Sequence, residues 1–472
     1  MNAQSTQSPP LTSAAGPWAL DLLLLERTSY GFSRADLAEL RQRGPWAYLE
    51  WQLEPDTIDD SYVDAELGQF PALTMSGQQL FDTFGFDNGW LTSHQLRGAR
   101  ILRAVSSRRQ LYERMVEFWT DHLNVPAGQD DAYFLKVVDD RDVIRPHALG
   151  NFRDMLRASS KSAAMLSSLD NDSNELGAPN ENYSREVMEL HSLGVDGGYT
   201  EDDVRELARC FTGWTFNHTW EPNYGEFRFD SWRHDDGPKT VLGVNIPAGG
   251  GLTDGELMID FLALHPQTAK HLATKLTRWL LSYDPPKAIV DRAAAAYLAS
   301  GGEIKPMVRV ILSADGFARA KPWENRKFKR PAHFAFSLLR ALEAPQGDLD
   351  QAPWSINNLG QHLYSWPAPN GYPDSAGAWG SNLLPRWTFA SHLCIGWLWW
   401  NTIPQSHLVQ LIENADRSDW AKAIDLVLTG GRMTVEERAA VQSFVDNVPF
   451  VSDSDLGQAF EVAANSPTFQ SY

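Results

Sequence analysis

Apolar side chains recur at a helical period along almost the whole chain. The stretch after Ser107 shows this most clearly, because Leu111, Met115, Phe118 and Trp119 follow one another at intervals of three or four residues. Such spacing places these side chains on one face of an α-helix. The same pattern predicts further helices at about 33–53, 146–158, 181–193, 201–212, 266–280, 287–299, 331–343, 383–401, 418–429 and 434–446.

Strand-like alternation is scarce. The best candidates are 226–229 and 239–246, which we expect to form a small hairpin. The loop-rich stretches 213–252 and 344–382 contain several tryptophans, so we interpret them as loops packed on a helical body. We predict a mostly α fold: residues 17–472 form a single large helical domain with long aromatic-rich loops and at most a small β-hairpin, and residues 1–16 form a disordered tail.

Composition limits the class of protein. The 472 residues are 43% apolar and 21% charged, which excludes wholesale disorder, and the net charge of −19 argues against nucleic-acid binding. The two cysteines make neither a disulfide framework nor a thiolate metal site. No apolar run reaches 18 residues and the start lacks a basic signal-peptide region, so we expect no membrane span and a cytoplasmic protein, with export beside a partner as the alternative.

Two histidines fall on predicted apolar helix faces, in a site-bearing core at about 107–280. His122 continues the stripe that follows Ser107, and His191 lies in the stripe of the helix predicted over 181–193, with Glu186 at its opposite edge. Burying an imidazole or a carboxylate is costly unless the group is paired. The pattern leaves two interpretations open: separate core histidines, or a polar cluster suited to acid–base or metal chemistry.

A second constellation has the spacing of a calcium loop. Counting Asp170 as position 1, oxygen-bearing side chains fall at positions 1, 3, 5 and 12, namely Asp170, Asp172, Asn174 and Glu181. Position 6, which should be glycine, is Glu175. The competing interpretation, which we favour, is an Asx-rich turn before the next helix.

Other candidates come from loops and from charged faces. His234 and Asp235 are adjacent in a Gly-rich loop, where they suit a metal or substrate site or a simple hydrophilic turn. For substrate binding the candidates are Trp214, Arg185, Asn182, Lys239 and Tyr372. Loop aromatics suit sugar stacking, or else they pack loops onto the body. We interpret the basic run at 321–330 as a solvated face, with binding of an anionic substrate or an acidic partner as the alternative. Arg185 is interpreted as part of a surface ion-pair ladder, and Trp397, Trp399 and Trp400 as core.

These candidates lie within motifs that resemble a known bacterial family, the domain of unknown function 1800. The matching stretches, in chain order, are FWTDHLNV at 118–125, IRPHALGNF at 144–152, NENYSRE at 180–186 with LHSLG at 190–194, GYTEDDV at 198–204, TGW at 212–214, HD at 234–235 with Lys239, HPQTA at 265–269, and GYP at 371–373. Tyr372 stands where the family usually has Trp, and Ser184 where it commonly has Ala. The resemblance implies a mostly helical protein, often exported in relatives and encoded beside a sulfatase-like partner, and it supplies no activity.

Three functional hypotheses follow. The leading one is an enzyme that performs acid–base hydrolysis or modification of a polar substrate, such as a glycan or an anionic molecule, with Glu186 as the acid/base, His122 and His191 orienting it, and His234 or Asp235 closing the site. The second is a non-catalytic helical scaffold that binds a protein partner. The third is a metal-dependent hydrolase in which a divalent cation is held by His122, His191 and Glu186.

Overall fold

The computed structural model describes residues 20–128, 131–413, 415–448 and 454–472, and confirms a mostly α-helical fold. The first part of the chain forms α1 (Leu20–Thr28), α2 (Arg34–Arg43), α3 (Pro45–Gln52), α4 (Ser61–Glu66), α5 (Gly77–Asn88), α6 (Trp90–Ser106) and α7 (Gln110–His122). The middle part forms α8 (Ala132–Asp139), α9 (Arg145–His147), α10 (Phe152–Ser160), α11 (Ala163–Ser168), α12 (Asn182–Glu186), α13 (Glu201–Cys210), α14 (Leu252–Ala263) and α15 (Pro266–Leu280). The predicted tail, 1–16, lies outside the described residues.

The last part of the chain forms the remaining helices. They are α16 (Lys287–Ala299), α17 (Ile304–Ile311), α18 (Ala314–Ala320), α19 (Pro331–Ala341), α20 (Ala352–Asn358), α21 (Ala376–Trp379), α22 (Leu384–Cys394), α23 (Gln405–Leu411), α24 (Trp420–Thr429), α25 (Val435–Asn447), α26 (Ser454–Ala464) and α27 (Pro467–Gln470). Two π-helical turns, η4 (Asp140–Ile144) and η6 (Val187–His191), extend α8 and α12. Short 3₁₀ turns are η1 (Pro55–Thr57), η2 (Leu67–Gln69), η3 (Pro71–Thr74), η5 (Asn171–Ser173), η7 (Ser231–Arg233) and η8 (Arg417–Asp419).

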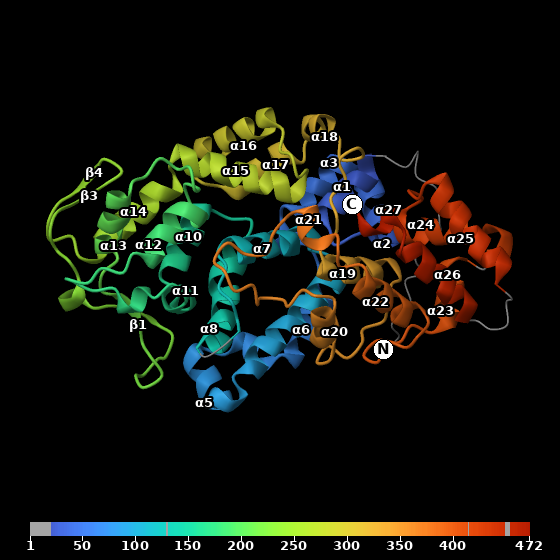
Figure 1. Cartoon of the computed structure of the whole chain (residues 1–472), viewed down its shortest axis with the longest axis horizontal. Helices are drawn as coiled ribbons and strands as arrows, with labels where there is room; N and C mark the ends of the chain where they lie inside the picture. Colours follow the sequence, from blue (N-terminus) through green and yellow to red (C-terminus); the bar gives the residue numbers. More distant parts are fainter. Residues whose placement is uncertain (1–19, 129–130, 414, 449–453) are drawn as a thin grey trace.

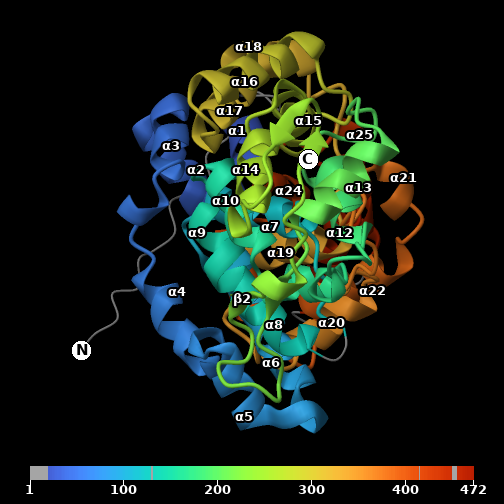
Figure 2. The ribbon, with the colours of Figure 1, turned by 90° about the vertical axis from the view of Figure 1, so that its left-hand side faces the viewer.

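The helices form an elongated body with α7 and α19 near its centre (Figure 1). The strands and α13 lie at one end, and α23 to α26 lie at the other (Figure 1). In the perpendicular view, α3 and α4 lie on one side of α7, and α21 and α22 lie on the other (Figure 2). Within the described ranges no helix is long and apolar enough to cross a membrane.

Several local predictions are confirmed and others need correction. The helix predicted over 266–280 is α15, which Pro266 opens, and the helix predicted over 201–212 is α13, whose start has a capping box of Thr200 and Asp203. The helix predicted over 33–53 is broken at Gly44, whose φ of 84° is incompatible with a continuing helix. The helix predicted in the stretch after Ser107 begins at Gln110, and Ser107 follows the end of α6, where its hydroxyl accepts a hydrogen bond from the Arg109 amide.

The strand prediction is wrong in its pairing. The run 239–246 is itself a hairpin, because β3 (Lys239–Val241) pairs with β4 (Val244–Ile246) around a two-residue turn in which Leu242 and Gly243 both have positive φ. The strand within 226–229, β2 (Phe227–Phe229), instead pairs with β1 (Trp214–Phe216).

The basic run 321–330 and the tryptophans after α22 also depart from prediction. Lys327, Lys329 and Arg330 are buried, because this segment lies against residues 470–472 and hydrogen bonds to their backbone. Helix α22 ends at Cys394, which leaves Trp397 and Trp399 on the surface at 73% and 60% exposure. Only Trp400 is core, as predicted.

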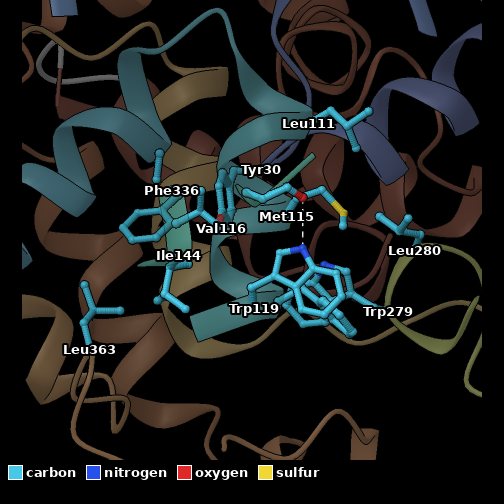
Figure 3. Packing of buried hydrophobic residues seen from close by; sticks show 14 of the residues in the cluster. Tyr30, Leu111, Met115, Val116, Trp119, Ile144, Trp279, Leu280, Phe336 and Leu363 are labelled. Carbon is cyan, nitrogen blue, oxygen red and sulfur yellow. Dashed lines mark hydrogen bonds between the residues drawn. The ribbon is translucent and has the colours of Figure 1, made fainter. Parts of the chain in front are cut away.

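One cluster of buried apolar side chains runs through the described chain, from Leu22 to Phe469. At its centre Trp119 and Trp279 lie beside Met115 (Figure 3). Each indole N–H is satisfied: Trp119 donates to the Ala148 carbonyl at 2.9 Å, and Trp279 donates to the Arg114 carbonyl at 3.2 Å. This packing fixes α7 against α15. The cavity described below is lined by residues of the same two helices.

Candidate functional site

A cavity of about 220 Å³ opens between the end of α7, the last turns of α15 and the loop 366–374. Its polar lining comes from Asp121, His122, Lys275, Arg278, Arg330, Asn370 and Asp374. Its aromatic lining comes from Phe118, Trp279, Trp366 and Tyr372. Charged and aromatic groups thus converge on a hollow that admits water and a small ligand.

The loop 366–374 is held against α7 by backbone contacts. Asn124, just past the helix, donates to the carbonyls of Trp366 and Ala368 at 2.9 and 2.8 Å. Gly371 has φ of 70°, and a Cβ at this position would lie 2.1 Å from the Asp121 carbonyl oxygen. Only glycine permits this approach, so the loop and the last turn of α7 form two fixed walls of the cavity.

His122 and Lys275 are in direct contact at the cavity wall. The imidazole Nε2 lies 3.1 Å from the His191 carbonyl, which can only accept, so Nε2 carries the proton. The other nitrogen, Nδ1, then has a free lone pair and accepts a hydrogen bond from Lys275 Nζ at 2.8 Å. The His191 carbonyl therefore sets the tautomer of His122, and the tautomer orients the Lys275 amine.

The π-helical turn η6 explains why two carbonyls face imidazoles. The C-terminal carbonyls of a helix lack intrahelical partners. Here Leu190 accepts from His271 Nε2 at 3.3 Å, and His191 accepts from His122. The His191 ring itself is buried, with its centroid 6.2 Å from that of His122, and neither of its nitrogens has a partner among the described residues. The histidines therefore form a neutral cap behind the cavity.

Burial shifts the pKa of every group in this cluster toward its neutral form. It lowers the pKa of His122 well below its usual value, that of His191 to about 3 and that of His271 to about 4, with the nearby Lys275 charge acting in the same direction. Burial also lowers the pKa of Lys275 to about 8, against the opposing charge of Asp121. The lysine therefore titrates within reach of neutral pH.

Asp121 is the acidic group of the cavity. Burial raises its pKa to about 6, and the charge of Glu117 adds to this rise, while an ion pair with Arg330 opposes it. Arg330 also donates to the Tyr372 carbonyl at 3.0 Å and thereby ties the loop to α7. Asp121 and Lys275 thus have pKa values on opposite sides of neutrality in one cavity.

The structure places Glu186 apart from this cavity. The prediction treated 181–193 as one α-helix, but η6 interrupts it, and the wider π turn changes which residues share a face. Glu186 is half-buried, and neither of the two histidines forms a hydrogen bond with it in the described chain. Burial, together with the neighbouring Glu189, raises its pKa.

His234, Asp235 and Lys239 form a separate cluster beside β3, which lies at one end of the body, whereas α7 lies near its centre (Figure 1). His234 Nδ1 donates to the Thr212 carbonyl at 2.8 Å, and its Nε2 faces Asp254 Oδ2 at 3.3 Å. Lys239 Nζ pairs with the same carboxylate at 2.6 Å. Asp235 pairs with Arg209, which lowers its pKa to about 2. These groups fasten the loop and do not line the cavity.

Most predicted substrate-binding residues also serve structural contacts. Trp214 is fully buried in β1, Arg185 pairs with Glu181 and Glu201, and Asn182 donates to Asp170 at 3.3 Å. Of that set, only Tyr372 lines the cavity with His122.

The calcium-like spacing forms a hydrogen-bonded turn. Asn174 donates to the Ala208 carbonyl and accepts from the Asn180 amide, and Glu181 pairs with Arg185. In the described ranges no three His, Cys, Asp or Glu side chains are arranged to hold a metal ion. Both His122 nitrogens are hydrogen-bonded, so a metal ion bound by His122, His191 and Glu186 would have to replace these contacts, and this ligand set stays a prediction.

Sequence reasoning did not single out Lys275, Asp121 or Arg278, and it placed Arg330 only within the basic run at 321–330. Asp121 directly precedes His122, and Lys275 lies four residues after His271 on α15, so a helical wheel drawn for both helices contains a usable signal. Arg330 carried no such signal, because its partners come from α7 and from the loop at Tyr372.

The family comparison covers nearly the whole chain. The family model described as "Protein of unknown function (DUF1800)" matches residues 23–471, and the chain belongs to this family. No curated protein and no solved structure matches it.

Proposed function

We propose that this member of the DUF1800 family is an enzyme that performs acid–base chemistry on a small polar substrate, with the cavity at the end of α7 as its active site. The observation that carries the proposal is the 2.8 Å contact between Lys275 Nζ and His122 Nδ1 at the wall of a 220 Å³ cavity that Asp121 also lines. Titratable groups with shifted pKa values that converge on a solvent-reachable cavity are characteristic of active sites.

The two pKa values assign the proton roles. At pH 7 Asp121, with a pKa of about 6, is mostly ionised and accepts a proton from water or from a substrate hydroxyl. Lys275, with a pKa of about 8, is mostly protonated and donates a proton to the leaving group. One base and one acid suffice for hydrolysis of a polar, glycan-type bond, and each proton transfer contributes on the order of 10²–10⁴-fold.

His122 acts as a positioning residue in this scheme. Its Nδ1 accepts one N–H of the Lys275 ammonium, which leaves the other two N–H groups free to donate to a substrate. Its Nε2–H is held by the His191 carbonyl, so the imidazole cannot easily change tautomer. The aromatic side chains of Trp279, Trp366 and Tyr372 supply flat apolar surface on which a ring stacks.

A panel of chromogenic glycosides, esters and phosphates tests the proposal. We expect the wild-type protein to turn over at least one class, and Asp121→Asn to lose at least 100-fold in kcat at equal folded fraction. The control is Asp196→Asn, an exposed carboxylate outside the cavity, which should retain wild-type turnover. Equal turnover by Asp121→Asn and wild type, or no turnover of any class, would contradict an active site here.

A second candidate function, binding of a protein partner, is supported by the surface after α22. Trp397 and Trp399 are largely exposed, and Trp399 borders a hollow of about 430 Å³ between α20 and α22. Exposed tryptophans of this kind are enriched at interfaces. Calorimetry with the purified partner tests this idea: Trp399→Ala should weaken binding about 30-fold, the size of an interface hot spot, and unchanged affinity would exclude this surface.

A further inference from the structure

The cavity has an excess of positive charge in a protein that is strongly acidic overall. The chain carries 60 acidic and 41 basic residues. Five charged side chains line the cavity: Asp121, Lys275, Arg278, Arg330 and Asp374. Their pairing decides the local charge, because an ion pair presents little net charge to a ligand.

Both cavity carboxylates already have cationic partners. Asp121 pairs with Arg330, and Asp374 pairs with Lys327 at 2.6 Å, where Lys327 is fully buried behind the cavity wall. The two remaining cations differ from these. Among the residues that the structure describes, neither Lys275 nor Arg278 forms an ion pair, and the Lys275 amine contacts only an imidazole that burial keeps neutral.

We propose that the cavity selects ligands that carry a negatively charged group, and that Arg278 is the residue that determines this specificity. The inference rests on the proposed function and names its substrate class: a small polar molecule, of sugar size, with one carboxylate or phosphate. Arg278 is exposed at the cavity rim, whereas Lys275 lies deeper beside His122. An arriving anion therefore meets the guanidinium first.

The geometry favours Arg278 over Lys275 as the anion-binding group. A guanidinium presents several N–H donors in a plane and binds carboxylate or phosphate in a bidentate manner. Lys275 has already committed one N–H to His122 and has a lowered pKa, so its charge declines above pH 8. Trp279 and Trp366 flank the site with apolar surface for the uncharged part of the ligand.

Equilibrium binding to the full-length protein tests the inference with a matched pair of probes, glucuronate and glucose, which differ in one carboxylate. Inorganic phosphate is the third probe and distinguishes a phosphate site from a carboxylate site. We expect glucuronate or phosphate to bind at least tenfold more tightly than glucose in calorimetry at low salt. Arg278→Met, which keeps most of the aliphatic stem, should remove most of that preference.

Lys270→Met is the control, because Lys270 is exposed on the same helix α15 and does not line the cavity. It should retain the preference. Equal affinity for all three probes, no binding by any of them, or a preference that survives Arg278→Met would overturn the inference. Failure of the proposed function is recognised separately, by absent turnover in a protein that still binds anions. Turnover without charge preference would remove only the present inference.

Discussion

Two buried clusters of this protein contain the same residue types and differ in how their charges are compensated. Beside β3, His234 and Lys239 both face the carboxylate of Asp254. At the end of α7, Lys275 faces His122, and no carboxylate forms an ion pair with it in the described chain. In the first cluster a carboxylate pairs with the lysine, whereas the second lines a cavity and, among the described residues, offers its lysine no such ion pair.

The comparison shows that a histidine and a lysine in contact do not by themselves indicate a functional site. When a carboxylate completes the group, the arrangement fastens a loop, and removing one partner is costly because it leaves a buried charge alone. When the partner is a neutral imidazole, the lysine pays a desolvation cost that nearby charge only partly offsets, and its pKa falls. Four experiments test whether the cluster at the end of α7 is functional and the cluster beside β3 is structural.

The largest effect should come from Lys275→Met. This variant removes the proposed general acid and keeps the aliphatic stem, so we expect a loss of 10²–10⁴-fold in kcat. The melting temperature should stay within a few degrees, because the substitution removes a desolvated charge that lacks a carboxylate partner. Steady-state kinetics and calorimetric unfolding measure the two quantities. A large fall in stability would assign Lys275 the structural role of Lys239.

Lys239→Met should give the opposite result. It leaves Asp254 buried without its cation, which typically costs about 3–5 kcal/mol of unfolding free energy. Turnover per folded molecule should stay near the wild-type value, since the cluster does not line the cavity. Urea unfolding monitored by tryptophan fluorescence provides the free energy. Substituting Asp254→Asn as well should recover part of the loss, and a lack of recovery would argue against a charge effect.

The pH profile of kcat/KM should be bell-shaped. Below the pKa of Asp121, about 6, the base becomes protonated, and above the pKa of Lys275, about 8, the acid loses its proton, so activity falls on both sides. The charged groups that face Asp121 are Arg330, Glu117 and Arg100. Lys275 faces the charge of Asp121 and three imidazoles that burial keeps neutral. A profile flat between pH 5 and 9 would exclude this pair as the proton-transfer groups.

Glu186→Gln should have the smallest effect. The sequence hypothesis makes Glu186 the acid/base and expects its loss to abolish turnover, but this carboxylate does not line the cavity. We therefore expect kcat within about twofold of the wild type and a small change in melting temperature. A loss of 100-fold would restore the sequence hypothesis and remove Asp121 from the central role.

Helical periodicity predicted the fold class and part of the candidate site. Each residue that it did not predict has a specific structural reason. The stripe through Leu111 and Phe118 correctly directs His122 into the protein interior. The same reasoning did not bring Glu186 to that histidine, because the π turn after it does not follow a 3.6-residue period. The sequence places Lys275 four residues after His271 on one helix, but only the packing of α15 against α7 brings its amine to His122. The Arg330 contacts join segments about 210 residues apart in the chain and leave no local pattern.

The approach of Gly371 to the Asp121 carbonyl determines how this cavity can change during evolution. Where two stretches of main chain touch, substitutions cannot widen the gap between them without moving a whole segment. The height of the cavity is therefore fixed, while its breadth depends on side chains such as Trp366 and Arg278. Relatives that bind different molecules should therefore differ at the positions of Trp366 and Arg278 and retain glycine at position 371.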